Sequence, residues 1–132
     1  QYKLAMPLQW DGNPIKAKFY WKPSSSTTTS HSVMWAIEGQ AHADGGELGA
    51  WGSLAISAVD DVIATDSTKK VHISAATPAL TIAGSPAAGA SELVYLRFQR
   101  VASHATDDLN EDAHLLGVAI QYQETAALQA GW

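Results

Sequence analysis

The residues best suited to chemistry lie close together in the stretch HATDDLNEDAH, from His104 to His114. These eleven residues include four acids and an asparagine, with a histidine at either end. Carboxylate and amide oxygens bind calcium, paired acids hydrolyse glycosidic bonds, and acids in turns cap backbone N–H groups. The stretch could therefore be a metal site, an active site or a structural turn.

The calcium hypothesis can be compared with the ligand spacing of an EF-hand loop. Asp108, Asn110 and Asp112 fall at its first, third and fifth positions. Ala113 stands where the sharp turn needs glycine, and Ala119 where the loop needs a bidentate glutamate. We therefore predict a solvent-facing turn that bonds its own backbone and binds no metal tightly. A looser calcium site is the alternative, with the candidate ligands Asp107, Asp108, Asn110 and Asp112.

Catalytic templates fail along the whole chain. The pairs Asp60/Asp61 and Asp107/Asp108 are sequence neighbours, so strand or turn geometry tends to splay their carboxylates, whereas glycoside hydrolysis needs two that face across a cleft. The stretch GSPAAGAS has the glycine spacing of a phosphate-binding loop, but Ala90 replaces its lysine. There is no G-x-S-x-G elbow and no cysteine. We expect no enzymatic activity, no catalytic residue and no cofactor.

The histidines show neither H-x-H nor H-E-x-x-H spacing. Surface positions on strands and turns are therefore expected, and a metal centre assembled across a trimer axis stays open as the alternative. The histidines are His31, His42, His72, His104 and His114.

Aromatic side chains offer a different chemistry, because exposed rings stack on sugars or fill subunit interfaces. Trp10 and Trp51 lie beside glycine-containing turns, where each ring could either close the core, which we favour, or bind a ligand. Tyr20 and Tyr95 alternate with apolar residues and should lie on the outer faces of their strands. The candidate ligand-binding residues are therefore Trp10, Trp51, Tyr20 and Tyr95.

The elements that must position these side chains are short strands. Apolar residues recur at every second position in several segments, whereas helical periodicity is almost absent. The clearest segments are PIKAKFYW (14–21), SVMWAIEGQA (32–41), ELVYLRFQR (92–100) and LLGVAIQYQ (115–123). Less regular strands are expected at 2–8, 53–62, 70–75 and 79–83, of which 53–62 also fits a helix.

Turn sequences rich in glycine, proline, serine and aspartate separate these segments. Seven or eight short strands at this spacing predict an all-β fold, an antiparallel β-sandwich of jelly-roll type. We expect one domain over residues 1–132 with a single core. The predicted core residues are Phe19, Trp21, Val33, Trp35, Ile37, Val94, Leu96, Phe98, Val118 and Ile120.

Composition narrows the possible partners. The net charge is −5, and the nearest thing to a basic stripe is Lys16, Lys18 and Lys22, so nucleic acid is not an expected partner. No apolar run is long enough to span a membrane. A membrane is therefore not an expected partner. The chain begins at QYKLAMPL without a start methionine, so we interpret it as the C-terminal part of a longer polypeptide.

The order of four motifs resembles a known class of domain. The motifs are KAKFYWKPSS, VMWAIEGQAHADGGELGAWGS, KKVHISAATPALTIAGSPAAGASELVYLRFQR and TDDLNEDAHLLGVAIQYQE. From about Trp10 to Gln123, the chain resembles the C-terminal β-sandwich domain of tailed-phage fibre-like and virion-surface structural proteins. The resemblance implies a location on the virion, at the tail or capsid surface. It gives no catalytic residue to transfer.

The same resemblance implies partners and a structural role for the acidic stretch. The expected partners are a homotrimer, other virion proteins and a host cell-surface glycan. Leu109 and Ala113 would plug one end of the sandwich, while Asp107 and Asp112 cap the turn before the last strand. The expected function is a distal tail-fibre or spike domain for host-receptor attachment and fibre trimerisation. The alternatives are a capsid decoration or head-fibre protein, and a carbohydrate-binding module of a secreted enzyme.

Overall fold

The computed structural model describes residues 2–6, 10–24, 30–45, 56–63, 70–84 and 93–124, and the structural statements below concern these residues. This part of the chain holds no helix that could cross a membrane. Its strands are β1 (Tyr2–Ala5), β2 (Lys16–Pro23), β3 (Ser32–His42), β4 (Ile56–Val62), β5 (His72–Ile73), β6 (Leu93–Arg100) and β7 (Ala113–Gln121).

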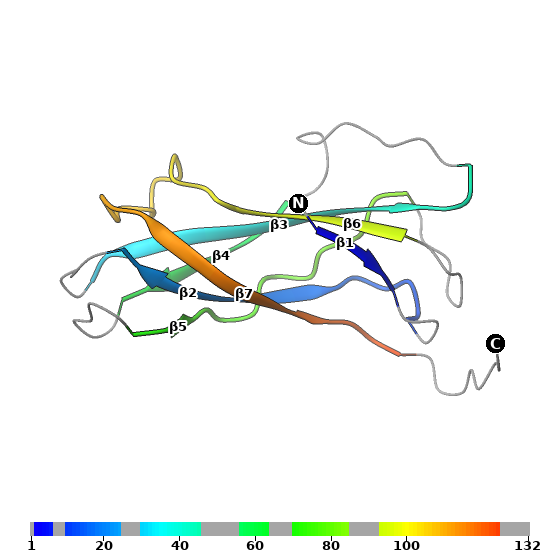
Figure 1. Ribbon diagram of the computed structural model, residues 1–132, viewed down its shortest axis with the longest axis horizontal. Coiled ribbons are helices and arrows are strands. Elements are labelled where there is room, and N and C mark those ends of the chain that lie inside the picture. Colours follow the sequence, from blue (N-terminus) through cyan, green and yellow to red (C-terminus); the bar gives the residue numbers. More distant parts are fainter. Residues whose placement is uncertain are drawn as a thin grey trace.

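These strands form two antiparallel sheets that pack face to face (Figure 1). One sheet has the strand order β1-β6-β3-β4, and the other has the order β5-β2-β7. The predicted all-β antiparallel sandwich is thereby confirmed, whereas its jelly-roll connectivity stays a prediction. The segment that also fitted a helix is a strand in its described part, β4.

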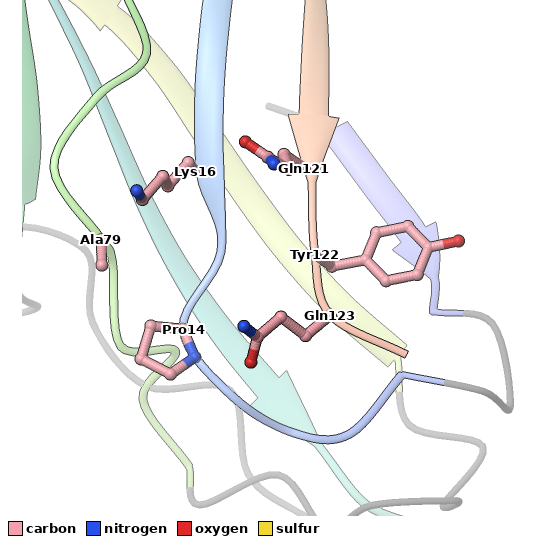
Figure 2. Close-up of a pocket in the computed structure, with 6 residues that line it drawn as sticks. All are labelled: Pro14, Lys16, Ala79, Gln121, Tyr122 and Gln123. Atoms are coloured by element: carbon pink, nitrogen blue, oxygen red, sulfur yellow. The ribbon is translucent and has the colours of Figure 1, made fainter. Parts of the chain in front are cut away.

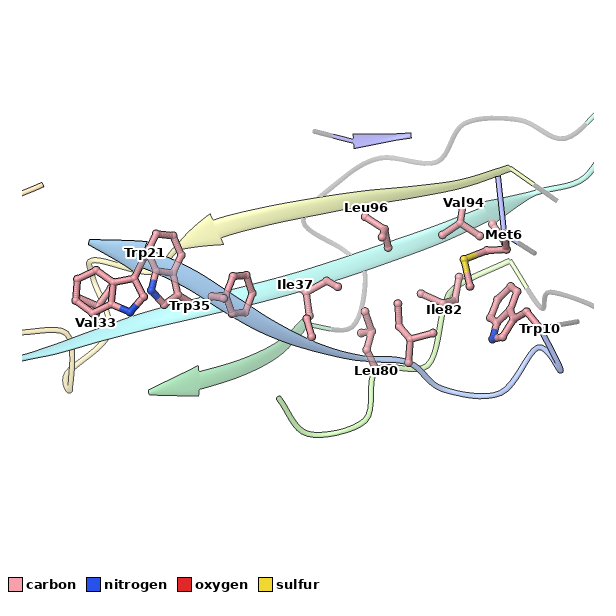
Figure 3. Close-up of a cluster of buried hydrophobic side chains, with 14 of the residues drawn as sticks. Met6, Trp10, Trp21, Val33, Trp35, Ile37, Leu80, Ile82, Val94 and Leu96 are labelled. Carbon is pink, nitrogen blue, oxygen red and sulfur yellow. The ribbon is translucent and has the colours of Figure 1, made fainter. Parts of the chain in front are cut away.

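The core is a long apolar layer between the sheets (Figure 3). Trp21 and Trp35 lie toward one end of it, and Met6 and Trp10 lie at the other. The Phe19 ring stacks on Trp35 with a centroid distance of 5.6 Å. The alternation placed the inward residues of β2, β3 and β6 correctly. Phe98, Val118 and Ile120 are partly buried at the margin of this core.

Residues 74–80 protect the edge of β2 that β7 does not cover. Ser74 and Thr77 are each 2% exposed, and their hydroxyl oxygens accept hydrogen bonds from the backbone N–H groups of Phe19 and Ala17, both at 3.0 Å. The backbone N–H groups of Ser74 and Thr77 donate in return to the carbonyl oxygens of Phe19 and Ala17. Side-chain hydroxyls thus replace the carbonyl groups that a regular strand would supply.

The strand predicted at 79–83 is wrong, because this segment crosses from one sheet to the other. It makes an isolated antiparallel bridge from Leu80 to Ile15 and a parallel bridge from Ala83 to Gln40. The crossing packs closely against Gly39 of β3. A Cβ atom on Gly39 would lie 2.5 Å from Cδ1 of Ile82, closer than packed carbon atoms approach.

Strand β3 is buried on both faces, although its sequence alternation predicts a half-buried strand. Every residue from 33 to 39 is buried, including Glu38, whose side chain is fully inaccessible. Glu38 forms an ion pair with Arg97, its antiparallel neighbour on β6. Pairing of this kind offsets the cost of burying a carboxylate, so the outer face of β3 can be buried as well as the inner one.

Candidate functional site

The acidic stretch lies in the loop between β6 and β7, and Asp107 is at its centre. The Asp107 side chain is 1% exposed and forms an ion pair with Arg100. Arg100 Nε donates to Oδ2 at 3.0 Å, and Nη2 donates to Oδ1 at 2.6 Å. The backbone N–H of Met34 also donates to Oδ2, at 3.0 Å. Fork-to-carboxylate geometry of this kind gives strong, directional hydrogen bonds.

The same arginine organises the rest of the loop. Its Nη2 donates to the carbonyl oxygen of Leu109 at 2.5 Å, and Nη1 donates to that of Glu111 at 2.6 Å. These bonds fold the loop around the guanidinium group. They also direct the Leu109 side chain into the core, where it is 6% exposed. The expected role of Leu109 as a plug at the sandwich end is therefore confirmed.

The loop extends the hydrogen bonding of β3 beyond the end of β6. The pairing of β6 with β3 stops at Trp35, opposite Arg100. Past that point, Ser32 N donates to Asp108 Oδ1 at 2.6 Å, and Asp108 N donates to Ser32 O at 3.2 Å. The prediction that these acids bond the turn's own backbone is thus wrong for Asp107 and Asp108, whereas the predicted exposure to solvent is wrong for Asp107 and correct for Asp108. Their carboxylates bond the backbone of β3, because β3 is longer than its partner strand.

Hydrogen bonding also controls the ionisation of the Asp107–Arg100 pair. Burial alone would raise the pKa of Asp107, but the hydrogen bonds from Arg100 and Met34 outweigh it and hold the pKa below its usual value. The hydrogen bond to Asp107 raises the pKa of Arg100 in turn. An acid kept ionised and bonded through both oxygens is a poor proton donor, so Asp107 is unsuited to general acid catalysis.

The second acid pair lies on β4 and is divided between the two faces of the sheet. Asp61 faces inward, and its Oδ2 accepts a hydrogen bond of 2.6 Å from Nε1 of the buried Trp21. Asp60 is exposed, and its pKa is raised first by partial desolvation and then by the charges of Asp61 and Asp108. Neighbouring residues of a strand point to opposite faces, so these two carboxylates cannot cooperate across one substrate.

The candidate metal ligands do not converge. Within the ranges that the structure describes, no group of three or more histidines and acids could hold a metal ion. Asn110 and Asp112 are exposed, and Asp112 contributes its backbone carbonyl to the N–H of Ser24 at 2.9 Å. Asp108 Oδ2 lies 3.5 Å from Nδ1 of His31. Asp107 and Asp108 thus already have protein partners.

The candidate ligand-binding aromatic residues have three different environments. Trp10 is 2% exposed and donates from Nε1 to the carbonyl oxygen of Asn13 at 3.1 Å, so its ring closes the core. Tyr95 is half-buried, and its ring contacts that of His42 edge to face at 5.2 Å. Tyr20 is half-buried on the outer side of β2, between the buried Phe19 and Trp21. Trp51 lies outside the described residues.

A positively charged surface covers the outer side of β2 and β7, and we call it the lysine face. Residues opposite each other on paired strands share a face. The register pairs Lys16 with Gln121, Lys18 with Ala119, Tyr20 with Gly117 and Lys22 with His114. Among the described residues, Lys16, Lys18 and Lys22 form no salt bridge. Their ammonium groups remain available to an external anion.

The middle of the lysine face is apolar, with open space at one position. Tyr20 lies between Ile73 on β5 and Gly117 on β7. The ladder shifts register between Tyr20 and Trp21, and Leu116 has no partner at that bulge. Leu116 is 52% exposed and Ile73 is 56% exposed. A Cβ atom added to Gly117 would meet nothing within 4 Å, so the space beside Tyr20 is open.

A hollow of about 280 Å³ opens at the end of the lysine face where β2 begins and β7 ends (Figure 2). Lys16 and Gln121 come from opposite strands, while Gln123 and Pro14 lie just beyond the strand ends. Ala79 closes the side away from β7. The hollow therefore combines an ammonium group with primary amides, which together can bind anions and hydroxyl groups.

The alternation of lysines in KAKFYWK is the sequence signal for this surface, whereas the net charge of −5 gives no indication of it. Comparison of the chain with protein-family models, curated proteins and solved structures finds no match. The side chains themselves indicate where function lies: Asp107 and Asp108 hold the fold at one end, and β2 and β7 carry a cationic face.

Proposed function

We propose that this chain is a non-enzymatic structural domain of a phage virion, located distally on a tail fibre or spike. There it attaches to a host receptor and takes part in fibre trimerisation. The observation on which the proposal chiefly rests is the lysine face, an exposed surface with a hollow on an otherwise acidic sandwich. The motif resemblance in the sequence supports the virion location.

The arrangement of the acids supports the non-enzymatic part of the proposal. Asp107 is bonded by Arg100 and Met34, and Asp61 is bonded by Trp21. Hydrolysis of a glycosidic bond needs one carboxyl group free to give a proton and another free to act as nucleophile or base. Among the described residues, the carboxyl groups of Asp61 and Asp107 stabilise the fold through these hydrogen bonds. A surface that binds a ligand without cleaving it is suited to receptor attachment.

Immunoelectron microscopy tests the location. A Fab raised against the purified domain is added to intact particles of the phage whose genome encodes this chain, with a Fab against an unrelated antigen as control. We expect label at the distal ends of tail fibres or spikes. Label on the capsid would favour the decoration or head-fibre alternative, and particles without label would contradict a virion role. Reproducible cleavage of a host polysaccharide, abolished by Asp60→Asn, would contradict the non-enzymatic role.

A further inference from the structure

We propose that the lysine face binds an acidic oligosaccharide, a chain of sugars bearing carboxylate or phosphate groups. The inference rests on the proposed receptor-binding role and specifies its ligand. One acidic sugar occupies the hollow beside Lys16, and the following sugars lie along β2 and β7 toward Tyr20 and Lys22. Four features of the face lead to this ligand: its charge, the polar groups of the hollow, its length and its apolar middle.

The charge of the face is opposite to that of the whole chain. The chain has a net charge of −5, yet Lys16, Lys18 and Lys22 project from one face of one strand. Clustered charge of one sign attracts ligands of the other and raises their association rate. Because Lys16 and Lys18 are exposed, salt will screen this attraction strongly. An anionic ligand whose affinity falls with ionic strength is therefore expected.

The hollow at the end of the face suits one sugar residue. Its volume of about 280 Å³ is just below the range for drug-sized ligand sites, roughly 300–1,000 Å³, and is enough for a single sugar. Lys16 supplies an ammonium group for a carboxylate or phosphate. The side-chain amides of Gln121 and Gln123 supply both donors and acceptors, which sugar hydroxyl groups require. Acidic and neutral groups of one sugar residue would thus each find a partner.

The face is long enough for several sugars. Lys22 is six positions after Lys16, which corresponds to about 20 Å along a strand. Between them, Tyr20 stands beside the open position of Gly117, with Ile73 on its other side. A ring flanked by a glycine presents apolar surface on which the C–H side of a sugar can rest. The alternation of cationic and apolar groups matches a chain of acidic sugars.

Two other anionic or apolar partners fit the face less well. A second copy of this chain would have to bury the lysines, although lysine is depleted in the cores of protein interfaces. A nucleic acid normally selects a strongly basic domain, whereas the pI of this chain is about 5.3. An acidic oligosaccharide needs less positive charge and leaves the lysine side chains partly hydrated.

Isothermal titration calorimetry with defined probes tests the proposal. The probes are oligogalacturonate for carboxylates, a short poly(glycerol phosphate) for phosphates, maltoheptaose as the neutral control and a single-stranded oligonucleotide. We expect one or both acidic glycans to bind, with affinity that weakens as salt rises, and maltoheptaose not to bind. Tightest binding to the oligonucleotide, or equal binding of acidic and neutral sugars, would overturn the proposal.

Two variants place the ligand on this face. Lys16→Gln should weaken acidic-glycan binding by about tenfold, since it removes a charged hydrogen-bond donor. Lys70→Gln removes the same charge from an exposed lysine that lies on neither β2 nor β7, at the end of β2 away from the hollow, and should weaken binding much less. Gly117→Val adds a side chain where space is open, so the fold should persist while binding weakens.

The two kinds of failure can be separated. Equal effects of Lys16→Gln and Lys70→Gln would overturn the assignment of the ligand to the lysine face. Sedimentation can detect self-association of the wild-type chain. If self-association occurs and Lys16→Gln or Gly117→Val abolishes it, the face binds a second copy of the chain and not a glycan. If no acidic glycan binds while the Fab still labels fibre tips, the ligand class is wrong and the proposed location at the fibre tip stands.

Discussion

Replacing Asp107 by asparagine should lower the free energy of unfolding by about 3–5 kcal/mol at neutral pH. The substitution leaves Arg100, whose side chain is 18% exposed, without its charged partner. It also weakens the bond from the backbone of Met34 to Oδ2. Domains of this size are commonly stable by only 5–15 kcal/mol, so the loss should be plain in urea or thermal unfolding.

The adjacent acid provides a matched control for this prediction. The side chain of Asp108 is 57% exposed and accepts one backbone hydrogen bond from Ser32, so Asp108→Asn should cost about 1 kcal/mol or less. Equal losses for the two variants would contradict the central position of Asp107.

The pH dependence gives a further check on the same pair. The pKa of folded Asp107 lies below its unfolded value, so its stabilisation is present at neutral pH and is lost as the pH falls through the folded pKa. The difference in stability between the wild-type protein and Asp107→Asn should therefore shrink in acid, below about pH 4. A difference that stays constant down to pH 2 would contradict the ionic account.

Replacing Trp35 by alanine should also cost about 3–5 kcal/mol, because it opens a cavity between the sheets. Trp35 is 3% exposed, stacks on Phe19 and contacts the Trp21 ring at 6.1 Å. Leu116→Ala is the control, since Leu116 is 52% exposed at the bulge of β7 and its truncation should change stability by about 0.5 kcal/mol or less. Urea unfolding measures both. A small loss for Trp35→Ala would show that this end of the core is loosely packed.

The strands and the core were predictable from sequence because both depend on local alternation. The inward residues of β2 must be apolar where they meet β3, and a period of two follows from strand geometry. The same pattern could not show that Glu38 is buried, since its burial depends on Arg97, far away in the chain. The pattern also could not distinguish a strand from the crossing at 79–83. Just upstream of this crossing, the hydroxyl groups of Ser74 and Thr77 accept the β2 hydrogen bonds that the backbone carbonyl groups of a regular strand would accept.

The acidic loop was predictable in kind but not in its partners. The missing glycine and glutamate argued against an EF-hand, and Leu109 was expected inside. The bonds from Asp107 to Met34 and from Asp108 to Ser32 join residues more than seventy positions apart. They arise because β3 extends past the end of β6, a length difference that no local pattern encodes.

The hollow on the lysine face could not be predicted from the sequence, because it depends on the register between β2 and β7. The alternation of Lys16, Lys18 and Lys22 was visible, but the hollow beside Lys16 exists only because β7 places Gln121 opposite it. The open space beside Tyr20 likewise depends on the register that brings Gly117 there. Register between distant strands is set by the whole fold, so the sequence alone shows the lysines but not the hollow beside them.

We expect Asp107 and Asp108 to hold β3 by their hydrogen bonds without the help of a metal ion. Calorimetric titration of the purified wild-type chain with calcium chloride tests it most directly, together with melting in the presence and absence of chelator. We expect no binding at micromolar calcium and the same melting temperature with and without chelator. Micromolar binding, or a melting temperature that falls by many degrees in chelator, would contradict it and identify a metal-stabilised turn.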